Sequence, residues 1–150
     1  MTNVKIRDFI PEDMEAVLTF REETGRISFP GKVMDKDAER KIILKHIKKY
    51  PGTIKVAEAG GKPIGFIRFQ PRSGPFGRFG YVNIIFVEKK YRRQGIGKLL
   101  LQEAEKFFSL MGIMEVTAEI TNTNINSLEF FRKNGYNERR TIVGKLLDSK

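Results

Sequence analysis

Five residues at one bend of the chain have the types and the spacing that bind anions. Arg92 and Arg93 are followed by Gly95, Gly97 and Lys98, between an apolar run and an amphipathic stretch. The glycines therefore stand where a helix should begin. The N-terminus of a helix carries unpaired N–H groups and the positive end of the dipole, and glycine lets a ligand approach that backbone closely. We expect a cradle for a diphosphate at this bend.

Two well-known phosphate-binding motifs do not fit the bend. A Walker loop requires G-x-x-x-x-G-K followed by serine or threonine, but Leu99 follows Lys98 and the earlier glycine is missing. A dinucleotide fingerprint requires a third glycine where Leu100 stands. A plainer interpretation remains open, in which Gly95 and Gly97 only allow a strand and a helix to pack closely.

The composition indicates one globular domain, which we place at residues 1–150, with 40% hydrophobic and 31% charged residues. The absence of cysteine excludes disulfides, thiolate zinc sites and a cysteine nucleophile. Because His46 is the only histidine, we expect no metal. The formal net charge of +10 favours an anionic partner such as a phosphorylated cofactor, RNA or an acidic protein, although a lysine-rich surface explains it equally well.

No apolar run approaches the roughly 18 residues that a membrane-spanning helix needs. The N-terminal sequence MTNVKIRDFIPED has acidic residues where a signal peptide requires an uninterrupted apolar core. We therefore expect a cytoplasmic protein without membrane contact.

Hydrophobic periodicity predicts the element order β-α-α-β-β-β-α-β-α-β. The predicted strands are 3–9, 53–59, 63–70, 81–87, 114–120 and 139–147, with a GGK hairpin between the second and third. Helices are predicted to begin at Pro11, at a cap formed by Asp35 or Asp37, at the glycine bend and near Asn126, and to end at Gly25, Pro51, Gly112 and Gly135. The segment 71–80, PRSGPFGRFG, is predicted to be a loop.

The predicted strand 81–87, YVNIIFV, is apolar at nearly every position, which is typical of a central strand buried on both faces. Strict alternation would place Tyr81 and Asn83 on the same face as Ile85 and Val87.

Two motifs lie at a fixed separation around these strands. The first is Arg or Gln, two residues, Gly, one residue, then Gly or Ala, and the chain has Arg92-Arg93-Gln94-Gly95-Ile96-Gly97. The second follows the next strand and has Asn124, Ser127, Phe130, Phe131, Gly135 and Tyr136. Both motifs and the element order resemble the GNAT superfamily of acyl-CoA N-acyltransferases over the whole chain. The layout is most similar to that of ribosomal-protein N-terminal acetyltransferases.

The resemblance implies an α+β fold of three layers, with helices on both faces of a mixed, mostly antiparallel sheet. Two parallel strands, here 81–87 and 114–120, splay apart to form the acyl-CoA cleft. The implied reaction transfers the acetyl group of acetyl-CoA to a primary amine by direct attack in a ternary complex. The acceptor, a small molecule or a protein N-terminus or lysine, is not indicated, and neither is the choice between monomer and homodimer.

The resemblance also implies contacts with acetyl-CoA. Backbone groups of Phe86 and Val87 would bind the pantetheine arm, and backbone N–H groups of Arg92, Arg93, Gln94, Gly95, Ile96, Gly97 and Lys98 would bind the diphosphate. Asn124 would contact the pantetheine, and Phe131 would pack beside the thioester. Asn124 as a helix cap and Phe131 as a core residue are the plainer interpretations.

The catalytic positions are implied less completely. Glu119 lies five residues before Asn124, at the base position of the ribosomal-protein enzymes, and strand alternation turns it away from its apolar neighbours. An exposed strand glutamate is the plain alternative. Phe131 stands where many members have a tyrosine acid, and phenylalanine cannot donate a proton. Tyr81, Tyr136 or water would replace that acid, or the thiolate would leave unaided.

Two other functions are compatible with the sequence. An RNA- or ribosome-binding protein would use the positive charge and the arginines and aromatics of residues 69–81, which could stack on bases. A CoA-binding sensor without catalysis would explain Phe131. Turnover of acetyl-CoA with an amine separates the enzyme from the sensor, and salt-dependent nucleic-acid affinity would favour the RNA-binding protein.

Overall fold

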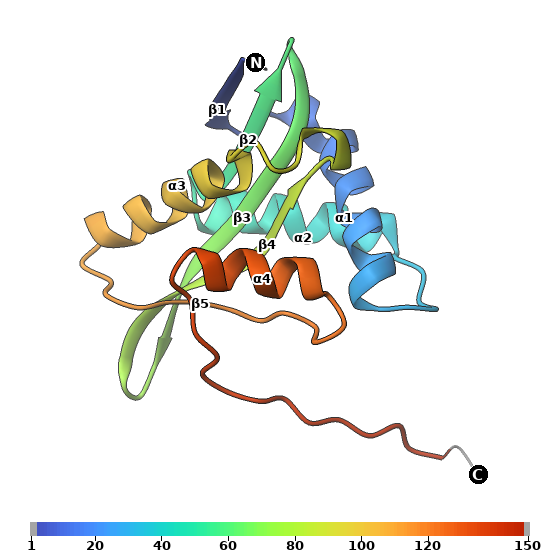
Figure 1. The fold of residues 1–150 in the computed structure, drawn as a ribbon. Helices are drawn as coiled ribbons and strands as arrows, with labels where there is room; N and C mark the ends of the chain where they lie inside the picture. Colours follow the sequence, from blue (N-terminus) through green and yellow to red (C-terminus); the bar gives the residue numbers. More distant parts are fainter. Residues whose placement is uncertain (1–2, 149–150) are drawn as a thin grey trace.

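The computed structural model describes residues 3–148, which form a five-stranded sheet with helices on both faces (Figure 1). The strands lie in the order β1-β2-β3-β4-β5, antiparallel except for the parallel pair β4–β5. Their bounds are β1 Val4–Asp8, β2 Ile54–Ala59, β3 Lys62–Gly74, β4 Gly77–Val87 and β5 Val116–Ala118. The predicted mixed, mostly antiparallel sheet is confirmed.

Four α-helices divide between the two faces of the described sheet. They are α1 Met14–Ser28, α2 Lys36–Lys49, α3 Ile96–Leu110 and α4 Ile125–Lys133, with short 3-10 helices η1 Pro11–Asp13 and η2 Lys89–Tyr91. Side chains of α1 and α2 pack with one face of the sheet in a core that includes Val17, Ile43 and Phe86 (the α1/α2 core). Side chains of α3 and α4 pack on the opposite face in a core that includes Phe108 and Phe131 (the α3/α4 core).

Local sequence signals explain several of these elements. Gly60 and Gly61 both have positive φ, 58° and 78°, as the tight turn of the β2–β3 hairpin requires. The side chain of Asp35 accepts a hydrogen bond from Ala38 N at 3.0 Å, which caps α2 and decides between the two predicted caps. The GGK hairpin and the beginning of α2 are thus confirmed.

The prediction of a loop at 71–80 is wrong, because β3 and β4 continue through it as a long hairpin that turns between Gly74 and Gly77. The glycine content indicated a loop, but Gly80 has another role. A Cβ at Gly80 would lie 2.5 Å from the Phe108 ring, so glycine here allows α3 to pack directly on the strand.

Two further boundaries and one predicted strand differ from the predictions. α1 passes Gly25 and ends at Ser28, just before Pro30, which cannot continue a helix. β5 is shorter than the predicted 114–120. The predicted strand 139–147 does not form within the described chain, because a strand requires a partner edge. At the start of this segment Arg139 lies 3.7 Å from Glu115, the residue that precedes β5. Beyond Arg139 the segment runs away from the sheet (Figure 1).

No helix in the described range 3–148 is long and apolar enough to cross a membrane.

Candidate active site

The parallel strands β4 and β5 pair over only three residues, and they separate beside two polar side chains. The pairing ends at Val82 and Ala118, so Asn83 and Glu119 are the first residues past it. From Asn83 to Val87, the edge of β4 on the β5 side has no strand partner in the described part of the chain. Backbone groups on this edge therefore lack a strand partner, and one of them, the Val87 carbonyl, accepts a hydrogen bond from Arg92 Nε at 2.7 Å instead.

A β-bulge at Asn83 shapes the start of this separation. Phe69 of β3 pairs with Val82 and Arg68 pairs with Ile84, so Asn83 is an extra residue on β4. Val82 packs in the α3/α4 core, and after the bulge Ile85 packs against the same core.

The bulge resets the alternation of side chains along β4. Because Tyr81 precedes Val82, it points to the α1/α2 side, while Ile85 and Val87 contact the α3/α4 core. The prediction that Tyr81 shares a face with Ile85 and Val87 is therefore wrong. Both faces of β4 are nevertheless covered, as the sequence predicts, because Val82 belongs to the α3/α4 core while Ile84 and Phe86 belong to the α1/α2 core.

The two glycines of the bend have different surroundings. Gly95 is the N-cap of α3 with φ 80°, follows Arg93 at φ 64°, and a Cβ there would meet nothing within 4 Å. No side chain caps this helix end, so its first N–H groups remain available. At Gly97, by contrast, a Cβ would lie 3.0 Å from the Phe130 ring. Gly95 thus has the open space that a phosphate cradle needs, and Gly97 allows α3 to pack against α4.

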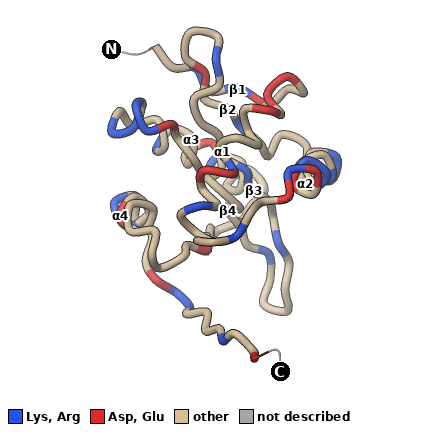
Figure 2. Tube along the Cα trace, turned by 90° about the vertical axis from the view of Figure 1, so that its right-hand side faces the viewer, with Lys and Arg blue, Asp and Glu red and all other residues tan. Residues whose placement is uncertain are grey.

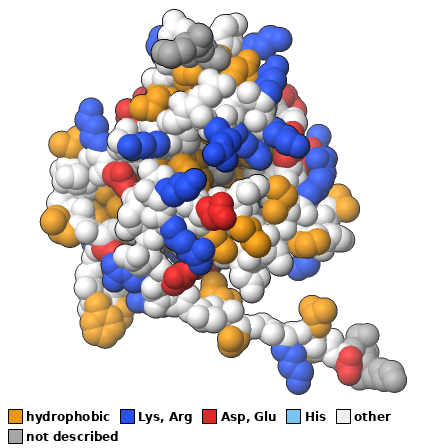
Figure 3. All heavy atoms as spheres, viewed as in Figure 1, with side chains coloured by type: hydrophobic (Ala, Val, Ile, Leu, Met, Phe, Trp, Pro, Cys, Tyr) orange, Lys and Arg blue, Asp and Glu red, His pale blue; other side chains and the backbone are white. Residues whose placement is uncertain are grey.

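The polar side chains of the bend differ in their contacts. Arg93, Gln94 and Lys98 are exposed. Arg92 folds back, because its Nε donates to the Val87 carbonyl at 2.7 Å and its guanidinium lies 5.5 Å from the centre of the Phe86 ring. Lysine and arginine side chains gather over the upper middle of the face in Figure 3, where Figure 1 shows this bend.

Other residues predicted to contact acetyl-CoA belong to the cores or cap a helix. Phe86, Ile96 and Phe131 are 6%, 3% and 4% exposed, so the first two have only backbone groups to offer a ligand. Phe131 packs edge-on against Phe130 and Tyr136. The side-chain oxygen of Asn124 accepts from Ser127 N at 3.3 Å and caps α4.

The two candidate acids lie in different places. The Tyr136 hydroxyl donates to Glu105 Oε2 of α3 at 2.8 Å, and burial together with this carboxylate raises the pKa of Tyr136 far above its usual value. Burial also raises the pKa of Tyr81, and the charge of Glu119 adds to that rise. Tyr81 is thus the tyrosine within electrostatic reach of the candidate base.

Glu119 is exposed and lies one residue beyond the end of β5. Its neighbours Ala118 and Ile120 pack against the α3/α4 core, so Glu119 points to the opposite side, as the alternation predicts. That side is also the side of Tyr81, because Tyr81 pairs with Thr117, two residues before Glu119.

A buried polar network on this same side was not predicted. Arg68 of β3 is 9% exposed, with its Nη1 3.5 Å from His46 Nδ1 and its Nη2 3.7 Å from Glu39 Oε1. The other oxygen of Glu39 lies 3.5 Å from Arg21 Nε. The signals in the sequence are an arginine inside the apolar run IGFIRFQ, and Glu39 and His46 seven residues apart on one helix face.

His46 is neutral in this network. Its Nε2 lies 2.9 Å from the Phe69 carbonyl, which can only accept, so Nε2 carries the hydrogen and Nδ1 faces Arg68 with a lone pair. Burial, reinforced by the positive charge of Arg68, lowers the pKa of His46 to about 4.

A groove of about 500 Å³ opens between α2 and β3 beside this network. We call it the basic groove. Its lining residues are Ile42, Lys45, His46, Lys48, Lys49, Tyr50, Arg68 and Gln70, which include four cations and no acid. The blue segments of α2 in Figure 2 show the lysines and arginines of this helix.

Within residues 3–148 there is no group of three or more histidine, cysteine, aspartate or glutamate side chains that could hold a metal ion.

Comparison with known proteins decides the family. The model of the Acetyltransferase (GNAT) family matches residues 15–136, which is most of the chain. The chain belongs to the GNAT acetyltransferase family. The resemblance carried by the glycine bend and by the α4 motif is confirmed.

Relatives of this GNAT protein agree over nearly its full length. An uncharacterized N-acetyltransferase from Methanocaldococcus jannaschii is 27% identical over 138 residues, which cover 91% of this chain and 80% of that one. An aminoglycoside N-acetyltransferase in complex with CoA has a TM-score of 0.79 at 18% identity, covering 98% and 96% of the two chains. The PaiA N-acetyltransferase from Thermoplasma acidophilum, with CoA, has a TM-score of 0.77 at 23% identity and 93% coverage of both. These structures confirm the GNAT fold.

The GNAT protein is accordingly an acetyl-CoA-dependent N-acetyltransferase, and the predicted enzyme class and co-substrate are confirmed. The bend has room for the anionic part of acetyl-CoA, because open space lies over Gly95 and the first N–H groups of α3 have no side-chain cap.

Proposed function

We propose that this enzyme acetylates its amine by direct attack in a ternary complex, with Glu119 as the general base. When bound, acetyl-CoA supplies a thioester carbonyl for the amine nitrogen and a thiolate as leaving group. Glu119 accepts the proton that the amine loses, directly or through one water. The observation that carries the proposal is the position of Glu119, exposed at the point where β4 and β5 separate.

We propose that the bend holds the diphosphate through backbone N–H groups from Arg92 to Lys98. The positive φ values of Arg93 and Gly95 and the open end of α3 support this assignment. The unpaired edge of β4 from Asn83 to Val87 would bind the pantetheine arm.

Neither Phe131 of α4 nor Tyr136 beyond its end serves as the acid for the leaving thiolate in this proposal, because Phe131 cannot donate and the Tyr136 hydroxyl already donates to Glu105. A thiol is acidic enough to leave as a thiolate without an acid. Tyr81 is the other candidate acid, because it keeps its proton at neutral pH and the charge of Glu119 raises its pKa. We further propose that the enzyme acts in the cytoplasm.

The test of the base is Glu119→Gln. Turnover with an accepted amine should fall by about a hundredfold or more, mainly in kcat, while calorimetric acetyl-CoA affinity stays the same. Glu115→Gln is the matched control, because Glu115 is an exposed glutamate at the other end of the same strand. Full activity in Glu119→Gln would remove Glu119 as the base.

Nucleic-acid binding has less support as a function. In the segment 69–81, Phe69 is fully buried, and the guanidinium of Arg72 covers the Tyr81 ring at 3.5 Å from its centre. Phe76, at the tip of the hairpin, is fully exposed, and one exposed ring is a small platform for stacking bases.

A further inference from the structure

We infer that the enzyme selects anionic amine acceptors, whose negative group binds in the basic groove while the amine lies between Asn83 and Glu119. The inference rests on the proposed role of Glu119 and extends it to the acceptor. Four cations line the groove, Lys45, Lys48, Lys49 and Arg68, without an acid among its lining residues.

The acid that contacts Arg68 of the groove is already neutralised. Glu39 lies between Arg21 and Arg68, at 3.5 and 3.7 Å from their nitrogens. The two arginines exceed this single carboxylate in charge, so the groove keeps a positive potential that attracts an anion.

A continuous polar row joins the groove to Glu119 across three strands. Gln70, which lines the groove, accepts a hydrogen bond from Asn83 Nδ2 at 2.9 Å and pairs with Tyr81 on β4. Tyr81 in turn pairs with Thr117 on β5, two residues before Glu119. These side chains share the α1/α2 side of the sheet, so an acceptor can lie along the row.

An unused polar atom marks the amine end of this row. Asn83 Oδ1 is buried and has no hydrogen-bond partner in the described chain, whereas its Nδ2 is engaged by Gln70. A buried acceptor without a partner is costly, so a rotation of the Asn83 side chain that brings Oδ1 to the surface of the row would let an N–H group of a bound amine satisfy it. The amine would then be placed beside the candidate base.

The spacing of the row sets the length of the acceptor. Neighbouring strands lie about 4.8 Å apart, so an amine between β4 and β5 lies about 7 Å from the β3 backbone. The groove cations lie beyond Gln70, so a carboxylate bound among them lies roughly 10 Å from the amine. An extended peptide covers that distance in about three residues. The geometry therefore favours an amine whose carboxylate lies about 10 Å away, such as a peptide N-terminus with an acidic third or fourth residue. A polycationic amine would be repelled by the groove.

The binding test needs no turnover. Two fluorescently labelled peptides with a free N-terminus would be compared by anisotropy, one with glutamate and the other with glutamine at positions three and four. We expect the glutamate peptide to bind about tenfold more tightly, since two or three partly screened ion pairs supply that difference, and the preference should shrink as salt is raised. Equal affinity for the two peptides would overturn the inference.

Reversing the charge of groove lysines tests whether the basic groove is the source of the preference for the glutamate peptide. In the double variant Lys45→Glu, Lys49→Glu, the preference for the glutamate peptide should disappear. Lys41→Glu is the matched control, because Lys41 is an exposed lysine of α2 outside the groove, and it should keep most of the preference. A preference that survives the double variant, or falls equally in the control, would overturn the groove as its source.

Measuring CoA release with the same peptides distinguishes a failure of this inference from a failure of the proposed function. CoA release should follow the same order, glutamate peptide above glutamine peptide, with free glutamate poorer than either because its two ends are too close. Selective binding without CoA release from any amine would contradict the proposed reaction while supporting the groove. Displacement of the glutamate peptide by a single-stranded RNA at lower concentration would overturn the acceptor assignment in favour of nucleic acid.

Discussion

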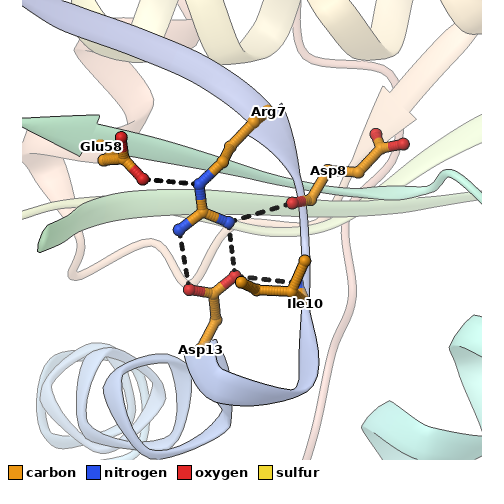
Figure 4. A network of polar contacts seen from close by, with 5 residues as sticks. All are labelled: Arg7, Asp8, Ile10, Asp13 and Glu58. Atoms are coloured by element: carbon orange, nitrogen blue, oxygen red, sulfur yellow. Dashed lines mark hydrogen bonds and ion pairs between the residues drawn. The ribbon is translucent and has the colours of Figure 1, made fainter. Parts of the chain in front are cut away.

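Two arginine-centred networks join strands to helices in this molecule, and they differ in how completely their hydrogen bonds are made. Arg7 of β1 donates to both oxygens of Asp13 at 2.7 and 2.9 Å and to Glu58 of β2 at 2.7 Å (Figure 4). Arg68 lies 3.5 Å from His46 and 3.7 Å from Glu39. We call the Arg7 network closed, because its hydrogen bonds are short and complete. We call the Arg68 network open, because its contacts are long and it borders the basic groove.

A structural ion pair differs from one that can bind a ligand in how many of its hydrogen-bonding positions are already occupied. Asp13 is 2% exposed, and its second contact is Ile10 N at 2.9 Å, so each oxygen of the carboxylate is used (Figure 4). Burial alone would raise the pKa of Asp13, but the bonds from Arg7 and Ile10 lower it overall. The Arg68 contacts are long, which leaves guanidinium N–H groups able to bind an anion.

The largest expected effect is on stability at the closed network. Arg7→Ala should lower the free energy of unfolding by about 3–5 kcal/mol, because Asp13 would remain buried without its partner. Arg68→Ala should cost less, since Arg21 still faces Glu39, and should instead weaken binding of the glutamate peptide. Urea unfolding measures the first effect and anisotropy the second.

Lys55→Ala provides the control for this pair of variants. Lys55 pairs with the exposed Asp8 on the same two strands, and surface pairs contribute at most about 1 kcal/mol. If Arg68→Ala proved as destabilising as Arg7→Ala and left peptide binding intact, the distinction between a closed and an open network would be wrong.

The second prediction concerns His46, at the open network. Its pKa is lowered to about 4 from an ordinary value of 6.5, so the fold favours the neutral ring. The stabilisation is complete above pH 6.5 and is lost as the pH falls toward 4, by at most about 3 kcal/mol. Urea unfolding at pH 7 and pH 4.5 should show a larger loss in wild type than in His46→Gln. Asp13 adds its own acid sensitivity equally to both proteins, so their difference isolates His46. Equal losses would contradict the assignment.

Much of the fold and the position of the bend could be predicted from the sequence, because periodicity and capping act locally. Asp35 and the Gly60-Gly61 turn are examples. The long hairpin at 71–80 was not predicted, because Gly80 serves contact with Phe108, a residue distant in sequence.

The candidate site was predicted only in part, for the same reason. The direction of Glu119 followed from alternation, whereas the bulge at Asn83 depends on register with β3 and broke the same rule for Tyr81. Arg68 and His46 come together through the packing of α2 on β3, which no short motif encodes.

The smallest expected effects distinguish the two glycines of the bend. Gly97 is packed against another side chain, whereas Gly95 faces open space. Gly97→Ala should cost about 1 kcal/mol or somewhat more, because its methyl group would press on Phe130, and should leave acetyl-CoA affinity nearly unchanged. Gly95→Ala should cost about 1 kcal/mol through its positive φ, and its methyl group would also enter the space over the N-terminus of α3. Gly112→Ala is the strain control, since Gly112 has φ 75° and open space at the other end of the same helix. Unfolding by urea should therefore rank Gly95 and Gly112 together, whereas calorimetry with acetyl-CoA should single out Gly95. If Gly112→Ala weakened acetyl-CoA binding as much as Gly95→Ala, backbone strain rather than occupation of the cradle would be the cause, and the diphosphate would have to lie elsewhere.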